Sequence, residues 1–245
     1  MPNNWGFPII KVSLILNGKA MSLMISLLTA AVAPAIALLC FFYLKDDFEQ
    51  EPIHMVIRCY LFGAILVFPI LFIQFALNEE GLVNTLFMEA LIQSAMIEEF
   101  LKWFIVVVAV YHHVHFNQRY DGIVYASAVA LGFASAENVL YLLANGVETA
   151  FFRAIFPVSS HAIFGVVMGY YLGKAKFYPH RKVRYLLYSF LYPFLLHSLY
   201  NLILLTQNHW LYFLIPFMIC LWIVGLRKVK KANETQAAVY YDAAS

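Results

Sequence analysis

Charged residues are scarce in this sequence: Asp, Glu, Lys and Arg make up 12% of its 245 residues. Soluble domains carry about 25% of these residue types, so the composition argues against a soluble protein. Apolar residues make up 63% of the chain and lie in long blocks. The formal net charge of +2 is too small to indicate nucleic-acid binding. The composition therefore predicts a polytopic membrane protein.

Cysteine is also rare, and all three cysteines lie within apolar blocks: Cys40, Cys59 and Cys220. Their spacing matches neither a disulfide framework nor a CxxC metal site, so we expect them to pack as small apolar side chains. The HExxH motif is absent, which excludes a conventional zincin helix. The GxSxG motif of serine hydrolases is absent too, and only Ser159 and Ser160 beside His161 leave serine chemistry open.

A membrane-spanning helix needs about 20 mostly apolar residues. By that criterion the chain predicts seven spans with short connections, at residues 22–44, 55–77, 84–110, 121–144, 153–173, 185–206 and 209–226. We therefore expect an all-α polytopic membrane protein, a single bundle of about seven transmembrane helices that encloses a polar cavity. Residues 1–21 would form an interfacial or poorly ordered N-terminal extension, residues 22–226 the bundle, and residues 227–245 a basic cytoplasmic tail.

The distribution of basic residues predicts the orientation. Lys and Arg gather in the link after the fifth predicted helix (residues 174–184) and in the tail after the seventh (residues 227–231). Because two helices separate these segments, both can face the cytoplasm, as the positive-inside rule requires. The expected topology is N-out and C-in, with the loop at Glu79 and Glu80 outside and the acidic run at residues 46–51 inside.

Three ionisable side chains interrupt the third apolar block, in the stretch AMIEEFLKWF. At a helix centre each opposes insertion by about 2.5–3.5 kcal/mol unless it pairs or reaches water. Glu98 and Lys102 stand at i and i+4, the favourable order for an ion pair, whereas Glu99 points about 100° away. We expect one lysine not to satisfy both carboxylates, so a purely structural ion pair explains the cluster poorly. The cluster therefore indicates function.

The next three predicted helices also carry polar groups. The fourth holds Glu137 and Asn138, the fifth holds His161, and the sixth holds His197 and Asn201 at i and i+4. A rise of ~1.5 Å per residue places Glu137 and the two histidines ~8–14 Å below the outer ends of their helices. Each alone could be a satisfied interior residue. Together they predict one cavity that opens outward.

Such a cavity suits water-mediated amide hydrolysis. A glutamate beside a second carboxylate in an apolar site is suited to general acid–base chemistry. Histidine can share the proton or donate to a developing oxyanion, and an asparagine amide is a good oxyanion donor. Glu98, His161, His197 and Asn201 fill these roles. Alternatively, Glu98, His161 and His197 would form a hydrolytic Zn²⁺ site.

Two other interpretations remain open. Glu98, Glu137 and Lys102 could form the proton relay of a transporter, although the sequence shows no repeat or pair of broken helices. The histidine run at residues 111–116 looks like a metal cluster, but it lies at the predicted cytoplasmic end of the third helix. We expect it to be an interfacial histidine run far from the cavity.

Four motifs occur in order on successive predicted helices: EEFLK, FASAEN, HAIFG and HSLYN. With them the chain, from about Met24 to about Lys231, resembles the PrsW family of bacterial intramembrane proteases. The residues before Met24 lie outside the resemblance, which favours an extension or a misassigned start. The resemblance implies a multi-pass protein of the bacterial plasma membrane. Its substrate would be a single-pass anti-sigma factor, cut at site 1 on the extracytoplasmic side to release a sigma factor under envelope stress.

The resemblance also implies roles for particular residues. Five would be catalytic: Glu98, Glu99, His161, His197 and Asn201. Three would support them: Lys102, Glu137 and Asn138. By analogy with the wider superfamily, which includes the CAAX prenyl endopeptidases, Glu98 would activate water with His161, while His197 and Asn201 would hold the oxyanion. The motifs favour no cofactor and leave Zn²⁺ as the alternative. A sensor that binds the anti-sigma factor without cutting it is a third possibility.

Overall fold

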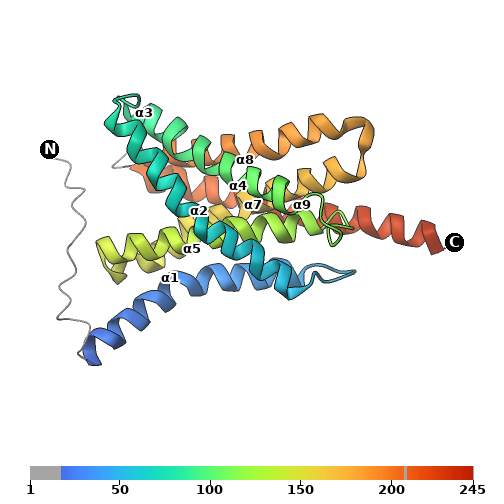
Figure 1. Ribbon diagram of the computed structural model, residues 1–245, viewed down its shortest axis with the longest axis horizontal. Coiled ribbons are helices and arrows are strands. Elements are labelled where there is room, and N and C mark those ends of the chain that lie inside the picture. The colour runs from blue at the N-terminus through green and yellow to red at the C-terminus, as the bar shows by residue number, and fades with distance from the viewer. Residues whose placement is uncertain (1–17, 207–208, 245) are drawn as a thin grey trace.

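The computed structural model describes residues 18–206 and 209–244, and these ranges contain helices but no strand. The long helices lie side by side and alternate in direction along the long axis of the molecule (Figure 1). In chain order the segments are α1 (Gly18–Leu44), α2 (Ile53–Glu79), α3 (Leu86–Met88), η2 (Glu89–Met96), α4 (Ile97–Ala109), α5 (Asp121–Asn145), η3 (Val147–Thr149), α6 (Ala150–Arg153), η4 (Ala154–Val158), α7 (Ser159–Phe177), η5 (Pro179–Arg181), α8 (Lys182–Leu204) and α9 (Trp210–Ala244).

The predicted all-α membrane bundle is confirmed. Among the described residues, six helical stretches are long and apolar enough to cross a membrane: Met21–Leu44, Ile53–Glu79, Asp121–Asn145, Val147–Phe177, Pro179–Leu204 and Trp210–Ala238. The third predicted helix, residues 84–110, consists of α3, η2 and α4 in succession. The predicted N-terminal extension falls mostly outside the described residues, and α1 begins at Gly18.

The last helix extends well beyond the predicted span at residues 209–226. Helix α9 continues to Ala244, so the basic segment at residues 227–231 is part of the same helix. The physical reason lies in the composition beyond Gly225. That stretch contains no proline or further glycine, and it is rich in Ala and Lys, which have high helix propensity.

Helix α5 is the centre of the bundle and packs against α1, α2 and α7. Its residues 121–135 are all buried. Glycines allow the backbones to touch: a Cβ at Gly132 would lie 1.9 Å from the Tyr60 carbonyl oxygen in α2. A Cβ at Gly169 in α7 would lie 2.0 Å from the Gly122 carbonyl oxygen. Such close approach through small residues is typical of helix packing in membranes, and it holds α7 directly against α5.

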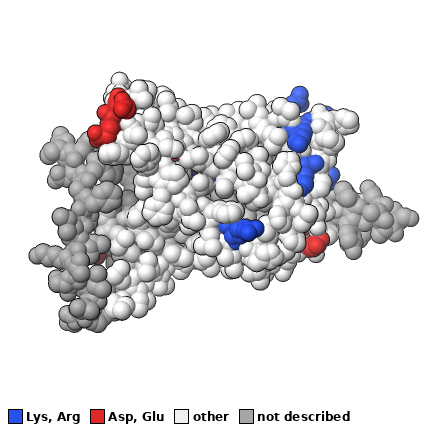
Figure 2. Space-filling view, viewed as in Figure 1, with Lys and Arg blue, Asp and Glu red and all other residues white. Residues whose placement is uncertain are grey.

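Both basic segments lie at the same end of the bundle. The α7–α8 connection and the C-terminal part of α9 reach the right-hand end in Figure 1, and Lys and Arg gather there in Figure 2. We call this the basic end. The arrangement agrees with the expectation that both segments face one side of the membrane. That this side is the cytoplasm stays a prediction.

The α1–α2 connection buries an acidic side chain. Asp46 is 6% exposed, and its Oδ1 accepts a hydrogen bond from the backbone N–H of Phe48 at 3.2 Å. Burial raises the pKa of the Asp46 carboxyl from 3.8 to about 6, while the Phe48 hydrogen bond opposes the shift and the charge of Glu51 adds to it. Between these two values the folded state holds a proton that the unfolded chain has released. This group therefore lowers stability as the pH rises through that window.

The substitution Asp46→Asn should flatten this part of the pH dependence. An amide cannot ionise, and its oxygen can still accept the Phe48 hydrogen bond. The wild-type free energy of unfolding should fall by about 3 kcal/mol more than that of the variant between pH ~4 and ~7, because one pKa unit corresponds to about 1.4 kcal/mol. Thermal unfolding of both proteins in one detergent, measured across this range, checks the difference. Parallel profiles would show that Asp46 does not titrate in the folded state in this window.

Candidate active site

Three helices bring four ionisable residues together in the interior of the bundle. Glu98 and Glu99 lie in the first turn of α4, His161 lies in the first turn of α7, and His197 lies in α8. One ligand atom of each lies within 4.8 Å of the others, and all four residues are buried. In the part of the chain that the structure describes, this is the only such group of His, Cys, Asp and Glu. We call it the Glu/His cluster.

Two π-helical segments precede the residues of the Glu/His cluster. Segment η2 ends directly before α4, and η4 ends directly before α7. A π turn adds one residue and so rotates the side chains that follow by about 100°. Pro157 within η4 has no N–H for a regular helical bond, which accounts for the irregular turn there. Segment η2 contains no proline, and the carbonyl oxygen of its Gln93 accepts a hydrogen bond from Gln74 Nε2 of α2 at 3.0 Å.

Lys102 places its ammonium group inside the Glu/His cluster. Its Nζ lies 2.8 Å from Glu99 Oε1, 3.3 Å from Glu98 Oε2 and 3.2 Å from His161 Nδ1. The ring of Phe133 covers it at 4.0 Å from the ring centre, a cation–π contact. Lys102 therefore contacts both carboxylates, although Glu99 Oε2 stays without a hydrogen-bond partner among the described residues. Residues at i−3 and i−4 both lie next to the lysine on a helix surface, so it reaches both.

The contacts of the two histidines assign their hydrogens. A lysine ammonium can only donate, so His161 Nδ1 accepts from Lys102, and the ring hydrogen sits on Nε2, which faces Glu137 Oε2 at 3.3 Å. A carboxylate can only accept, so His197 Nδ1 donates to Glu99 Oε1 at 3.0 Å. The two imidazole rings are perpendicular, with centres 5.1 Å apart. His161 therefore presents an unprotonated nitrogen to the interior of the Glu/His cluster.

Asn201 approaches the Glu/His cluster through a serine that the sequence motifs do not contain. Its Nδ2 donates to the carbonyl oxygen of Ala90 and to Ser94 Oγ, each at 3.0 Å. The Ser94 hydroxyl in turn donates to Glu98 Oε1 at 3.3 Å. Both amide hydrogens of Asn201 are thus engaged here, and Ser94 links them to the glutamate. The spacing of Ser94, four residues before Glu98, was the signal available in the sequence.

Glu137 and Asn138 are adjacent in α5 but lie in different surroundings. Glu137 contacts His161 and also Arg153 Nη2 at 3.2 Å, and its side chain is 36% exposed. Asn138 is fully buried and does not reach the Glu/His cluster: its Nδ2 donates to the carbonyl oxygen of Ala31 in α1, and its Oδ1 accepts from Arg153 Nε at 2.6 Å. Asn138 therefore ties α1 to Arg153, a buried cation that the motifs did not include.

The remaining candidates have local partners. The hydroxyl of Ser159 donates to the carbonyl oxygen of Ile155, and that of Ser160 to the carbonyl oxygen of Pro157 at 2.8 Å. These bonds within one helix give no support to a serine nucleophile. The histidine run at residues 111–116 lies in the connection after α4 and contributes nothing to the Glu/His cluster.

The Glu/His cluster fits a divalent cation by its donor set. Two imidazoles and two carboxylates are ligands that Zn²⁺ takes, and the buried Oε2 of Glu99 accepts no hydrogen bond from the described residues. The Lys102 ammonium, which contacts three of the four groups, stands where such a cation would sit. Glu98, His161 and His197 would hold the metal once Lys102 withdrew. A bound metal would supply Lewis-acid polarisation of a carbonyl or of water.

Comparison with known proteins identifies the family of this chain. The model of the PrsW family of intramembrane metalloproteases matches residues 51–225. The chain is 55% identical to Protease PrsW of Geobacillus kaustophilus over 210 residues, which are 86% of this chain and 93% of that protein. It is 50% identical to Protease PrsW of Bacillus subtilis over 212 residues (86% and 97%) and 29% identical to Protease PrsW of Clostridioides difficile over 228 residues (89% and 95%). No solved structure matches the chain significantly. Built around a buried cluster of glutamates and histidines, this chain belongs to the PrsW family of intramembrane proteases.

Proposed function

We propose that this protease makes the site-1 cut in a single-pass anti-sigma factor, on the extracytoplasmic side, and thereby leads to release of a sigma factor under envelope stress. The observation that supports a hydrolytic role is the Glu/His cluster, in which four ligand atoms lie within 4.8 Å of one another inside a membrane-spanning bundle. The family match and the names of the relatives favour a protease over the transporter that the sequence left open. The substrate class rests on the resemblance described above.

Glu98 is the proposed base. It is 8% exposed, the largest value among the four residues of the Glu/His cluster, and Ser94 and Lys102 hold its two oxygens in place. A water molecule between Glu98 and His161 Nδ1 would give one proton to the Glu98 carboxylate as the water oxygen attacks the peptide carbonyl carbon. The same proton then passes to the amine nitrogen as the peptide C–N bond breaks. The Lys102 ammonium must first leave His161 Nδ1, because the ammonium and the water molecule would donate to the same nitrogen lone pair.

His197 and Asn201 are the proposed oxyanion donors. Glu99 Oε1 accepts a hydrogen bond from His197 Nδ1 and so orients the ring. An imidazolium form of His197 would donate its Nε2–H to the oxyanion. Asn201 can donate only after one of its bonds, to Ala90 or to Ser94, is exchanged for the substrate oxygen. The substrate therefore has to enter beside η2, the segment that carries both of these acceptors.

The proposed orientation, N-out and C-in, puts the basic end in the cytoplasm. Both basic segments gather at that end (Figure 2), as the positive-inside rule requires. The connection at Glu79 and Glu80, between α2 and α3, then lies outside. A short substrate segment would reach the Glu/His cluster from the outer half of the membrane.

Cleavage of a tagged anti-sigma factor by the purified protein in detergent tests this proposal. We expect one cut on the extracytoplasmic side of the substrate's membrane segment, mapped by mass spectrometry of both products. A cut on the cytoplasmic side would contradict the proposed topology. Stable binding without products would favour the sensor, and an absence of both binding and cleavage would exclude this substrate class.

The same assay with a strong chelator answers the question of the metal. Cleavage that survives chelation would mean that Glu98 and His161 act with Lys102 as the resident cation. Cleavage that the chelator removes and Zn²⁺ restores would make Glu98, His161 and His197 metal ligands. Metal content measured on the same samples separates these two results from simple inactivation.

A further inference from the structure

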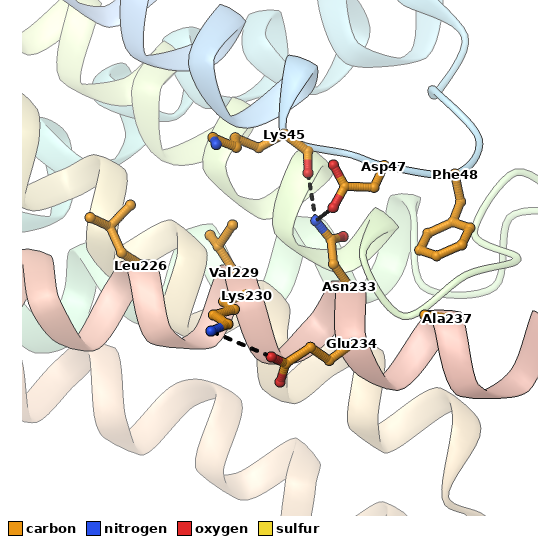
Figure 3. A pocket seen from close by; sticks show the side chains of 9 residues that line it. All are labelled: Lys45, Asp47, Phe48, Leu226, Val229, Lys230, Asn233, Glu234 and Ala237. Carbon is orange, nitrogen blue, oxygen red and sulfur yellow. Dashed lines mark hydrogen bonds and ion pairs between the residues drawn. The ribbon is translucent and has the colours of Figure 1, made fainter.

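Two cavities flank α9 near the basic end, and they differ in charge. The larger, of about 510 Å³, lies between the α1–α2 connection and α9 (Figure 3). It is lined by two lysines and two carboxylates: Lys45, Lys230, Asp47 and Glu234. Asn233 Nδ2 donates to Asp47 Oδ2 at 2.7 Å, and Lys230 pairs with Glu234 at 3.7 Å. Because side chains of both charge signs line this cavity, it has no electrostatic preference for an anion.

The second cavity, of about 340 Å³, lies on a different face of α9, against α7. Four cations line it, and no Asp or Glu does: Lys174, Arg227, Lys228 and Lys231. Among the described residues, none of these four cations forms an ion pair with a carboxylate. We call it the basic cavity. An uncompensated cluster of this kind is an electrostatic site for an anion.

Tyrosines hold two of these cations in place. The Nζ of Lys228 donates to the Tyr171 hydroxyl at 3.2 Å and lies 4.4 Å and 4.7 Å from the ring centres of Tyr171 and Tyr170. The Nζ of Lys174 lies 5.0 Å from the ring centre of Tyr170. Cation–π contacts fix the ammonium groups without neutralising them. The charges of Lys174 and Lys231 both act on Lys228, so a bound anion would relieve repulsion that the protein itself leaves in place.

The position of the basic cavity identifies the source of the anion. It lies near the basic ends of α7 and α9, two helices that can span a membrane. The Tyr171 ring contacts three tyrosine rings of α8, with 5.0–6.4 Å between its centre and theirs: Tyr185, Tyr188 and Tyr192. Tyrosines of this kind mark the level of lipid headgroups. We propose that the basic cavity binds the phosphate group of an anionic phospholipid from the leaflet at the basic end.

Binding to nanodiscs and to soluble phosphate tests the proposal. The full-length protein would be placed in nanodiscs of phosphatidylcholine with and without phosphatidylglycerol, and bound lipid would be counted by native mass spectrometry after gentle extraction. We expect phosphatidylglycerol to stay bound to the protein after extraction. We also expect the melting temperature to be higher in the discs that contain it than in the phosphatidylcholine discs. Inorganic phosphate at matched concentration should change neither. Equal stabilisation by inorganic phosphate would overturn the assignment to a lipid.

Two variants and one matched control localise the site. Lys174→Gln/Lys228→Gln removes the tyrosine-held pair, and Arg227→Gln/Lys231→Gln removes two exposed cations whose loss cannot unfold the core. Each pair should weaken phosphatidylglycerol binding about 25-fold, since one basic residue near an anionic surface contributes about fivefold. Lys230→Gln on the same helix, beside the charge-compensated cavity, should leave binding unchanged. An equal loss in Lys230→Gln, or full binding by both double variants, would refute the site.

Discussion

Glu98→Gln should reduce cleavage of the anti-sigma factor by about 10²–10⁴-fold, the contribution expected of a general base. The amide has the shape of the carboxylate but cannot take a hydrogen from water. It keeps an oxygen for Ser94, and Lys102 still contacts Glu99, so the fold should survive. Steady-state kcat/KM of purified wild type and variant, with melting temperatures of both, measures the effect.

Glu89→Gln is the matched control for this substitution. Glu89 lies in η2, close in the chain to Glu98, but its side chain is exposed. It should cleave at the wild-type rate. If Glu98→Gln retains activity within about tenfold of wild type, Glu98 is not the base. A variant that loses both activity and its melting transition would instead assign Glu98 a structural role.

Lys102→Met should produce the largest change in stability. Methionine fills a similar volume but leaves Glu98 and Glu99 buried without the cation that both contact. Removing one partner of a buried ion pair costs about 3–5 kcal/mol. We expect that loss in unfolding experiments with a chelator present. Because the four ligand groups are then unopposed, Zn²⁺ should restore the stability of Lys102→Met by more than it stabilises wild type.

The double variant Glu98→Gln/Lys102→Met separates a metal effect from a general charge effect. It lacks one carboxylate, so it should be less sensitive to the chelator than Lys102→Met, and Zn²⁺ should restore little. Bound zinc, measured directly on each protein, is a readout independent of activity. Should Lys102→Met be as stable as wild type in chelator and bind no zinc, Lys102 would not occupy a cation position.

The fold was predictable because a membrane imposes a length on each element. Blocks of about 20 apolar residues mark helices that must satisfy their own backbone hydrogen bonds. The order of the helices follows from the sequence, and six of the seven predicted spans match described stretches that can cross a membrane. The end of α9 was not predictable in this way. Beyond residue 226 the helix leaves the apolar pattern, and only helix propensity, which is a weak signal, continues it to Ala244.

The Glu/His cluster was only partly predictable. Polar residues in an apolar segment cost free energy unless they find partners, which is why Glu98, His161 and His197 indicated a common site. The partners themselves depend on rotation about the helix axes. Segments η2 and η4 change that rotation just before the functional residues, and no spacing rule for a regular helix includes this change. Arg153 became visible only in three dimensions, whereas Ser94 and Lys102 each stand four residues from Glu98, a spacing that the sequence shows.

The dispersal of the Glu/His cluster along the chain has a consequence for biosynthesis. Contacts in and beside the cluster join residues that are 59, 98 and 111 positions apart, so they can form only after α7 and then α8 have been made. A chain still emerging from the ribosome lacks His197 and Asn201 until the sixth predicted span has been made. On the proposed mechanism it therefore lacks both of the proposed oxyanion donors at that stage. On the proposed mechanism, cleavage activity should therefore appear only after α8 has been inserted.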